Sequence, residues 1–270
     1  MSRAATRRHY IMVRPTYFDV EYSSNPLIDP GKPTSSELAG VQWEWLHRLY
    51  LELGHRVDQI EPRPGLPDMV FAGSGATVAG SQVLVARFRH ADRAPESALF
   101  LDWFRARGNR RVRQAKWVNE GGRDHLIAGP RILAGSWWGS SAQAHEELYD
   151  YFGIPVVGLT IVEPRYYHLD TALAVLDDDT IMFYPPAFSS DSCRLLDDLY
   201  PDAIRATDED AAAFGLDAVS DGRHVVLPEA ATALIAQLRA RGFEPIGADL
   251  SELLKAGGAA RSCTLEVHGA

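Results

Sequence analysis

Apolar residues recur at helical spacing in five stretches of the chain. The clearest stretch is Ser36–Gly54. Its apolar stripe consists of Leu38, Val41, Trp45, Leu46, Leu49 and Leu53. Ser35 or Ser36 is suited to cap the start of this helix, and Gly54 is suited to end it, because glycine readily takes the left-handed conformation that closes helices. The same pattern predicts helices at Pro95–Gly108, Ser141–Gly153, Asp191–Tyr200 and Pro228–Gly242.

Short extended segments lie between these helices. They predict strands at His9–Val13, Arg56–Ile60, Asp68–Ala72, Gln82–Arg87, Ile154–Val162, Leu173–Val175, Ile181–Tyr184 and Arg223–Leu227. Four helices end at glycines 54, 108, 153 and 242, and the fifth helix falls in the widest gap. The spacing favours a unit of roughly 45–55 residues, strands plus one helix, that recurs about five times. Chance spacing is the alternative. We therefore expect one α/β domain covering residues 1–270.

Composition narrows the class of protein. The chain of 270 residues is 46% hydrophobic and 23% charged, fractions that are ordinary for a folded domain and not for a disordered one. Its formal charge is −9, and basic residues cluster only at Arg7–Arg8 and Arg110–Arg113. We therefore expect neither a nucleic-acid partner nor an anionic membrane partner.

The two cysteines, Cys193 and Cys263, are too few for a disulfide framework or a zinc site built mainly from thiolates. The N-terminus lacks the apolar core of a signal peptide, and no apolar run approaches the roughly 18 residues that span a bilayer. These features predict a cytoplasmic protein with reduced thiols. Whether it forms a homo-oligomer is left open.

Four segments place acid, base or thiol groups beside turn residues. They are residues 67–71 with Asp68, 119–124 with Glu120 and Asp124, 167–171 with His168 and Asp170, and 257–264 with Cys263. In an extended chain, His168 and Asp170 would point to the same face. Each segment also has a purely structural interpretation, as a turn cap, a solvated acid, a core histidine or a packing cysteine.

Other catalytic motifs are not supported. Residues 73–80 are rich in glycine but lack the Lys-Ser/Thr ending of a phosphate loop. No His-Glu-x-x-His or Gly-x-Ser-x-Gly motif occurs, and the nine histidines are scattered. We therefore expect no metal and no organic cofactor.

Taken in order, the four segments resemble those of the guanidine-modifying, or pentein, superfamily, and most closely its bacterial dimethylarginine dimethylaminohydrolase-like branch. The resemblance covers nearly the whole chain. It runs through Arg14-Pro-x-x-Phe18, Asn25-Pro26, PDMVF ending at Phe71, Glu120-Gly-Gly-x-Asp124, Tyr167-His-Leu-Asp-Thr171, Tyr184-Pro-Pro-Ala-Phe188, Lys255-Ala-Gly-Gly258 and Thr264-Leu-Glu266. It implies a five-bladed α/β propeller of ββαβ repeats around a central site, in agreement with the repeat suggested by the glycine spacing.

The resemblance also implies roles for these residues. Asp68 and Asp170 would hold a planar guanidinium, whose paired N–H donors suit carboxylates. His168 would act as general acid and then as base, with Glu120 orienting it, and a thiolate would attack the guanidinium carbon. A charged His168 would favour that thiolate. Further substrate contacts are implied for Phe71, Ser74 and Gly258. Asp124 matches the motif less closely, and a structural role in its turn is the alternative.

The nucleophile position departs from the family pattern. Aligning Gly257-Gly258 and Thr264-Leu265-Glu266 leaves no gap and places Ser262 where the family has cysteine, with Cys263 one position later. In an extended segment a one-residue offset turns a side chain to the opposite face. Three explanations are open: a deliberately inactivated Cys→Ser form, a natural non-hydrolytic homologue, or a register change that brings in Cys263 as the fallback nucleophile. As written, the chain is expected to have little or no turnover.

Two further departures concern the substrate. Where relatives commonly have Arg-Thr, this chain has Trp138-Gly139-Ser140, which leaves Arg87 or Arg93 as candidate grips for an α-carboxylate. Ser74 replaces an asparagine often found at its position. These departures suggest a substrate other than plain free arginine, either methylated or with a modified carboxyl end.

The sequence therefore predicts a guanidino hydrolase that takes a cationic, arginine-like small molecule. Citrulline plus an amine or ammonia is the first expected outcome, and complete removal of the amidino group to give ornithine is the second. The alternative from another class is a binding protein that kept the cationic pocket and lost its nucleophile.

Overall fold

Repeated three-stranded sheets make up the fold. The computed structural model describes residues 3–20, 33–109, 111–136 and 142–268. Within these ranges the strands form five sheets of three strands each. In every sheet the central strand pairs antiparallel with one neighbour and parallel with the other. Parallel neighbours need a crossover, and one of the longer helices connects each such pair.

Each blade is therefore a ββαβ unit. The first holds β15 (Leu265–Glu266), β1 (His9–Val13), β2 (Arg56–Ile60) and α1 (Ser36–Glu52). The second holds β3 (Ala76–Ala79), β4 (Gln82–Val85), β5 (Arg111–Gln114) and α2 (Glu96–Ala106). The third holds β6 (His125–Ala128), β7 (Arg131–Ser136), β8 (Val156–Thr160) and α3 (Ala142–Phe152). The fourth holds β9 (Leu173–Val175), β10 (Ile181–Phe183), β11 (Ile204–Arg205) and α5 (Ser190–Leu199). The fifth holds β12 (Val219–Ser220), β13 (His224–Pro228), β14 (Glu244–Ala248) and α7 (Thr232–Ala240).

Shorter helical segments connect the blades. They are the helices α4 (Leu169–Ala172), α6 (Asp208–Ala212) and α8 (Ser251–Leu254), and the 3₁₀ turns Pro67–Val70, Ala72–Ser74, Gly121–Arg123 and Pro185–Ala187.

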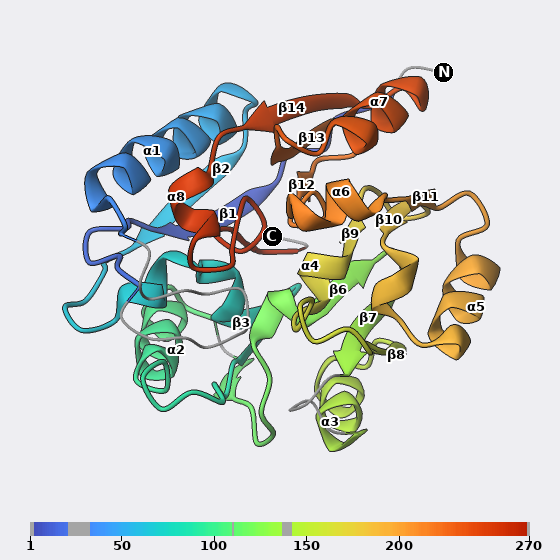
Figure 1. Cartoon of the computed structure of the whole chain (residues 1–270). Coiled ribbons are helices and arrows are strands. Elements are labelled where there is room, and N and C mark those ends of the chain that lie inside the picture. The colour runs from blue at the N-terminus through green and yellow to red at the C-terminus, as the bar shows by residue number, and fades with distance from the viewer. Residues whose placement is uncertain (1–2, 21–32, 110, 137–141, 269–270) are drawn as a thin grey trace.

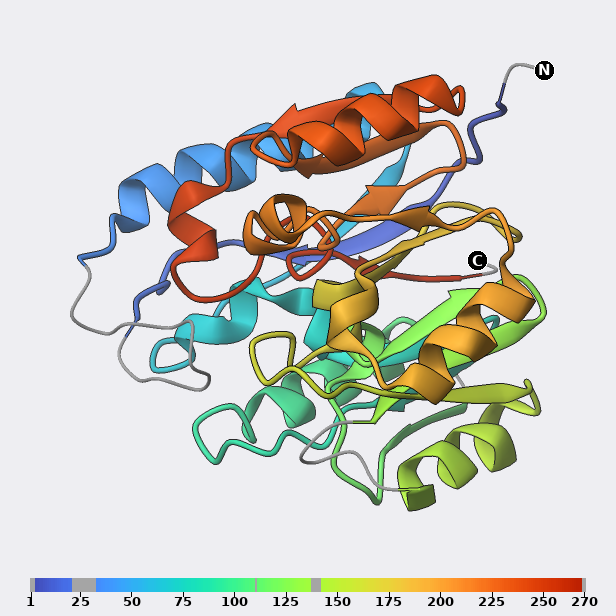
Figure 2. The same ribbon diagram turned by 45° about the vertical axis from the view of Figure 1, so that its right-hand side comes forward.

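The blades surround a common axis. The five longer helices lie around the outside and the sheets lie inside them (Figures 1 and 2). The first strand of each blade faces the axis, where β9 contacts both β6 and β12. In the first blade this inner strand is β15, so the two ends of the chain share one sheet, with Tyr10 opposite Glu266. The expected five-bladed fold is confirmed.

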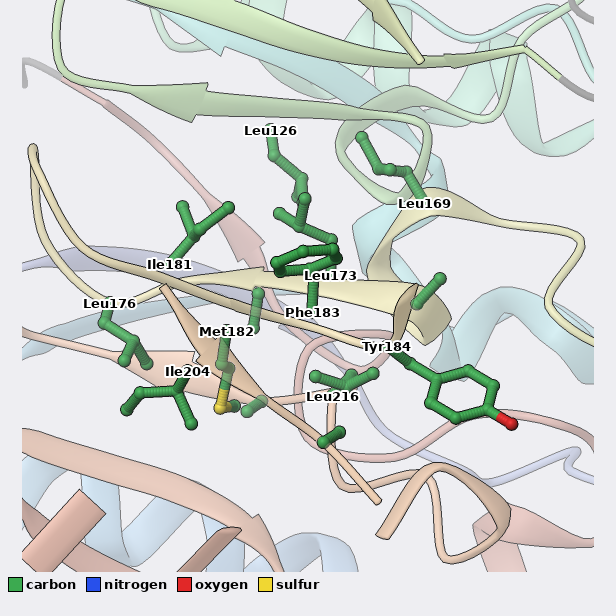
Figure 3. Close-up of a cluster of buried hydrophobic side chains, with 14 of the residues drawn as sticks. Leu126, Leu169, Leu173, Leu176, Ile181, Met182, Phe183, Tyr184, Ile204 and Leu216 are labelled. Carbon is green, nitrogen blue, oxygen red and sulfur yellow. The ribbon is translucent and has the colours of Figure 1, made fainter. Parts of the chain in front are cut away.

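Apolar side chains fill the space between blades. The largest cluster joins the third, fourth and fifth blades. Figure 3 shows Phe183 on one side of β10 with Leu126 and Leu169, and Met182 on the other side with Ile204. Successive residues of a strand point to opposite faces, so β10 packs against the neighbouring blades on both sides.

This packing predicts a large cost for Phe183→Ala. Phe183 is fully buried, and truncating such a ring typically costs about 3–5 kcal/mol of unfolding free energy. Urea denaturation followed by circular dichroism measures it. Leu195→Ala, on the exposed side of α5, is the matched control and should change stability by less than about 0.5 kcal/mol. Equal small losses in both variants would contradict the packing described.

All five predicted helices are confirmed, but the face of the first helix that was expected to be buried was wrong. Ser35 caps α1 by accepting from the Leu38 amide at 3.1 Å, and Gly54 has the expected left-handed φ of 84°. However, Leu38 and Val41 are 41% and 62% exposed. The face that packs on the sheet instead consists of Ala39, Gln42, Trp43, Leu46 and Tyr50. Two large aromatic rings cover more of the sheet than the leucine and valine would.

Two segments predicted as extended are helical turns. The expected strand Asp68–Ala72 is a pair of 3₁₀ turns, and Pro67 stands at the first position of the first one. His168 caps α4, so it and Asp170 do not lie on one face of a strand. In both places the chain bends just before an inner strand, which turns polar side chains toward the axis.

Candidate active site

The candidate site lies at one end of the propeller axis, where a segment of each blade precedes its inner strand. Asp68 comes before β3, Glu120 before β6 and His168 before β9. Asp217 comes before β12, and Ser262 before β15. Repetition of the blade therefore brings five segments that are far apart in sequence to one place.

His168 contacts two carboxylates. Its Nδ1 lies 2.7 Å from Asp124 Oδ1, and its Nε2 lies 3.5 Å from Glu120 Oε2. With Nδ1–H donating to Asp124, the closer carboxylate sets the tautomer, and Nε2 faces Glu120. Burial is the main cause that lowers the pKa of His168 well below its usual value, and the Arg123 guanidinium lowers it further. The lowered pKa favours the neutral imidazole over the charged form that would favour a thiolate.

This geometry changes the expected division of roles. Glu120 was expected to orient His168, but the shorter contact belongs to Asp124, which also accepts from the Glu120 amide at 2.8 Å. Asp124 thus serves the turn and the imidazole together. Gly121 lies in this turn with φ of 56°, and a Cβ there would lie 2.7 Å from the Ser74 carbonyl oxygen. Glycine is required for this close approach.

Arg93 is held in a buried acidic cluster. Its guanidinium makes a bidentate pair with Glu96, both bonds being 2.9 Å. It also donates to Glu120 Oε2 at 3.0 Å, to Ser74 Oγ at 3.2 Å and to the Asp68 carbonyl at 3.3 Å. In this conformation Arg93 fixes the acids of the site, and its five hydrogen bonds occupy all five of its N–H donors, which leaves none for a substrate carboxylate.

Asp170 and Arg123 form a second buried ion pair. Arg123 Nε donates to Asp170 Oδ2 at 2.8 Å, and its Nη2 donates to the Gly257 carbonyl at 3.2 Å. Asp170 Oδ1 is buried and accepts no hydrogen bond from the described residues. Burial raises the pKa of Asp170 to about 7, although Arg123 opposes this. An orphaned carboxylate oxygen of this kind is a ready acceptor for a cationic donor.

Ser262 lies in a buried loop that ends at β15. Its amide donates to Asp217 Oδ1 at 2.9 Å, and its hydroxyl makes a short hydrogen bond to Asp217 Oδ2. A Cβ on Gly258 would lie 2.8 Å from Ser262 Cβ and 2.5 Å from the Phe71 ring. Gly258 therefore lets the loop pass closely beside Phe71.

Cys263 is not placed as a fallback nucleophile. It is fully buried and packs in an apolar cluster with Tyr50, Leu253 and Ala260. Burial raises the pKa of its thiol well above the usual value, and the Asp217 carboxylate adds to this. Cys263 lies in a turn, where its amide donates to the Ala259 carbonyl at 3.1 Å, and not in the extended segment expected from the sequence. Cys193 on α5 is half-buried, and burial raises the pKa of that thiol too.

A small cavity of about 20 Å³ marks the site. That is room for about one water molecule, so a substrate must displace lining side chains. The predicted residues among those lining it are Asp68, Phe71, Arg93, Glu120 and His168. Arg87 is not among them: it is exposed, and its Nε donates to the Ala115 carbonyl at 2.9 Å, so it is no candidate grip here.

Sequence reasoning missed several residues of the site. Arg89, His90, Arg123, Tyr167 and Ala256 also line the cavity. Arg123 occupies the variable position of the Glu120-Gly-Gly-x-Asp124 motif, and the motif gave no reason to single it out. Asn25-Pro26 and Trp138-Gly139-Ser140 lie outside the described residues.

A second cavity, of about 220 Å³, lies toward the other ends of the inner strands. Its polar lining includes Arg8, Arg261 and Glu266, and it contains none of the predicted site residues. Among the described residues, no group of three or more His, Cys, Asp or Glu side chains is arranged to hold a metal ion. No helix in those ranges is long and apolar enough to cross a membrane.

Comparison with known proteins gives clear relatives. No protein-family model matches the chain. It is 52% identical over 266 residues to an N(G),N(G)-dimethylarginine dimethylaminohydrolase of Mycobacterium tuberculosis, covering 98% of this chain and 88% of the relative. It is 33% identical to the bifunctional arginine dihydrolase/ornithine cyclodeaminase AgrE of a Nostoc species, covering 97% of this chain but only 38% of that protein.

A solved structure supports the same relationship. The N-terminal domain of ArgZ, a cyanobacterial arginine dihydrolase, superposes with a TM-score of 0.92 at 32% identity, covering 97% of this chain and 98% of that one. That structure is a cysteine-to-serine variant bound to substrate.

Proposed function

Because the chain belongs to the guanidine-modifying superfamily, in its dimethylarginine dimethylaminohydrolase-like branch, we propose that this site binds an arginine-like guanidinium and is built to hydrolyse one of its C–N bonds. The relative that is 52% identical over nearly the whole chain is named for this activity on dimethylarginine. We therefore take an N-methylated arginine as the first substrate to test.

The observation that carries the proposal is the unused acceptor of Asp170. Its Oδ1 is buried without a partner among the described residues. Asp170 follows His168 by two positions but does not itself line the small cavity, so a bound guanidinium must reach it by displacing side chains. Leaving a buried charged acceptor unpaired is costly, and a planar cation that donates two N–H groups removes that cost. Asp68, which lines the cavity, supplies a second carboxylate for the same guanidinium.

The reaction that these residues support needs a nucleophile at position 262. With cysteine there, neutral His168 takes the thiol proton, and the thiolate sulfur bonds to the guanidinium carbon. The C–N bond to the leaving amine then breaks as the imidazolium gives that nitrogen its proton. Water, deprotonated by His168, adds to the amidino-thioether carbon, and the C–S bond breaks to return the thiol. The products are a ureido compound and an amine.

With serine at position 262, the protein is proposed to bind substrate and to turn it over poorly or not at all. A hydroxyl is far less acidic than a thiol, and this one is already hydrogen-bonded to Asp217. The substrate-bound cysteine-to-serine form of ArgZ is consistent with retained binding in that relative. A guanidino-compound-binding homologue is the second candidate function, and Ser262 is the observation that favours it.

The product separates two enzyme candidates within the family. Hydrolysis at one C–N bond gives citrulline, whereas removal of the whole amidino group gives ornithine, and the AgrE and ArgZ relatives are named as arginine dihydrolases. Ser74 is short, buried and hydrogen-bonded to Arg93, so it contributes no amide group to the cavity. Chromatography of the products formed by the Ser262→Cys variant distinguishes the two.

Substrate binding should strengthen as pH rises through about 7. Below that pH Asp170 becomes protonated and loses the charge that attracts a cation, because burial raises its pKa to about 7. One linked proton weakens binding by about tenfold for each pH unit below that value. Isothermal titration calorimetry of the Ser262 protein with dimethylarginine between pH 5.5 and 8.5 measures this.

Two controls make the binding test specific. L-Citrulline has nearly the same shape without the positive charge and should show no such pH dependence. Asp170→Asn should weaken dimethylarginine binding and remove the slope. Asp210→Asn alters a buried carboxylate that accepts from the α7 amides of Ala233 and Leu234, outside the site, and should keep the slope. A slope that survives Asp170→Asn contradicts the assignment.

A further inference from the structure

The fifth blade contributes Asp217, to which neither the motifs nor the comparisons assign a role. It stands just before β12, in the place that Asp68, Glu120, His168 and Ser262 hold in the other four blades. It is fully buried. Burying a carboxylate costs free energy unless hydrogen bonds and counter-charges compensate, so the partners of Asp217 indicate its purpose.

Those partners belong to the loop that carries Ser262. The Asp217 carboxylate accepts from the amides of Ala259 and Ser262, both at 2.9 Å, and from the Ser262 hydroxyl. Its backbone carbonyl accepts from the Arg261 amide at 3.4 Å. Arg123 Nη2 lies 4.0 Å from its Oδ2 and supplies the nearest positive charge. One side chain thus fixes both the backbone and the hydroxyl of the nucleophile position.

The turn that presents Asp217 is itself strained. Phe214 has a φ of 57°, the one positive value among the non-glycine residues that the structure describes. Such a conformation costs on the order of 1 kcal/mol or more for a bulky residue. The Asp217 amide donates to the Phe214 carbonyl at 3.0 Å, so this turn fixes the backbone from which the carboxylate projects.

We propose that Asp217 is the positioning residue of the nucleophile loop, holding residue 262 at the axis and binding the hydroxyl that a serine provides there. The inference rests on the proposed function, since it takes position 262 as the nucleophile position. It has a chemical consequence. A carboxylate beside position 262 repels a negative charge on that side chain, so Asp217 disfavours a free thiolate as well as placing the thiol.

The test compares Ser262→Cys with Ser262→Cys/Asp217→Asn. Iodoacetamide alkylation is followed against pH, and residues 193, 262 and 263 are read separately by peptide mass spectrometry. We expect the alkylation midpoint at residue 262 to fall by about one pH unit when the carboxylate is lost. We also expect kcat on dimethylarginine to fall at least tenfold with a smaller change in KM, because the thiol is less well placed.

Cys263 provides the internal control. It is the next residue and, like Ser262, is fully buried, but its side chain packs in an apolar cluster. Alkylation there as fast as at residue 262 would therefore show that the loop has unfolded and would overturn a positioning role. An unchanged midpoint and an unchanged kcat would overturn it as well. Asp210→Asn removes a buried carboxylate of the same blade and should leave the midpoint at residue 262 where it was.

A second measurement applies to the protein with Ser262. Amide hydrogen exchange of Ala259 and Ser262 should be faster in Asp217→Asn than in Asp210→Asn, and equal rates count against the proposal. Asp217→Ser replaces the Asn variant if the latter does not fold. If Ser262→Cys hydrolyses no guanidino substrate, the proposed function fails, while the alkylation and exchange comparisons still decide the role of Asp217.

Discussion

The Ser262→Cys variant should hydrolyse dimethylarginine with kcat/KM raised by several orders of magnitude over the Ser262 protein. The upper bound is about 10⁶-fold, the loss seen when a covalent hydrolase is deprived of its nucleophile. A thiol is acidic enough to form a few per cent of thiolate near neutral pH, and a neutral His168 is available to take its proton. A colorimetric citrulline assay, with amine release followed in parallel, measures the change.

Two control variants test whether the gain in activity comes from a thiol at position 262. Ser262→Ala removes the hydroxyl without adding a nucleophile and should be no more active than the Ser262 protein. Cys263→Ala in the Ser262→Cys background should retain turnover, because the Cys263 side chain packs in the core. Turnover that disappears with Cys263 would show that the wrong residue has been assigned.

Removing the imidazole should have the second-largest effect. In the Ser262→Cys background, His168→Asn should lower kcat by about 10²–10⁴-fold, the range typical of a general acid–base group, with a smaller change in KM. The pH profile of kcat provides the more specific test. In the Ser262→Cys protein at saturating dimethylarginine, where weaker binding through protonated Asp170 does not limit the rate, kcat should fall on the acid side with a midpoint below pH 6.5. Burial and Arg123 lower the pKa of His168, and its protonated form cannot accept the thiol proton.

Asp124→Asn is the companion variant for this group. Asparagine can still accept from Nδ1–H, but it carries no charge to stabilise the imidazolium that forms during the reaction. We expect a smaller loss of kcat than for His168→Asn and a further lowering of the acid midpoint. If His168→Asn and Asp124→Asn leave both kcat and the acid limb unchanged, His168 is not the acid–base group.

The sequence predicted which residues meet in the cavity better than it predicted the secondary structure of the segments that carry them. The ordered motifs brought Asp68, Glu120 and His168 to one cavity although each segment alone has an ordinary structural interpretation. The short apolar run after Pro67 was interpreted as a strand, because a strand and a buried turn share that composition. The turn is stabilised by tertiary contacts with β1 and with the loop that carries Ser262. A local sequence pattern contains no information about those contacts.

Side-chain direction and pairing could not be predicted. Nothing in the Glu120–Asp124 segment shows that Asp124, and not Glu120, takes Nδ1 of His168, since that depends on how the third and fourth blades meet. Arg123 and Asp217 were missed because buried charges are rare and each is justified only by the other segments around the axis. The one signal for Asp217 was the repeat itself, in which the fifth unit should also supply a residue before its inner strand.

Intact-mass spectrometry after rapid acid quench tests most directly whether position 262 is where this fold attacks a guanidinium. The Ser262→Cys protein is mixed with dimethylarginine and the adduct is located by peptide mapping. We predict a transient increase equal to the substrate mass less the released dimethylamine, confined to residue 262 and absent from the Ser262 protein. Product formation with no adduct, or an adduct on Cys263, would contradict the account.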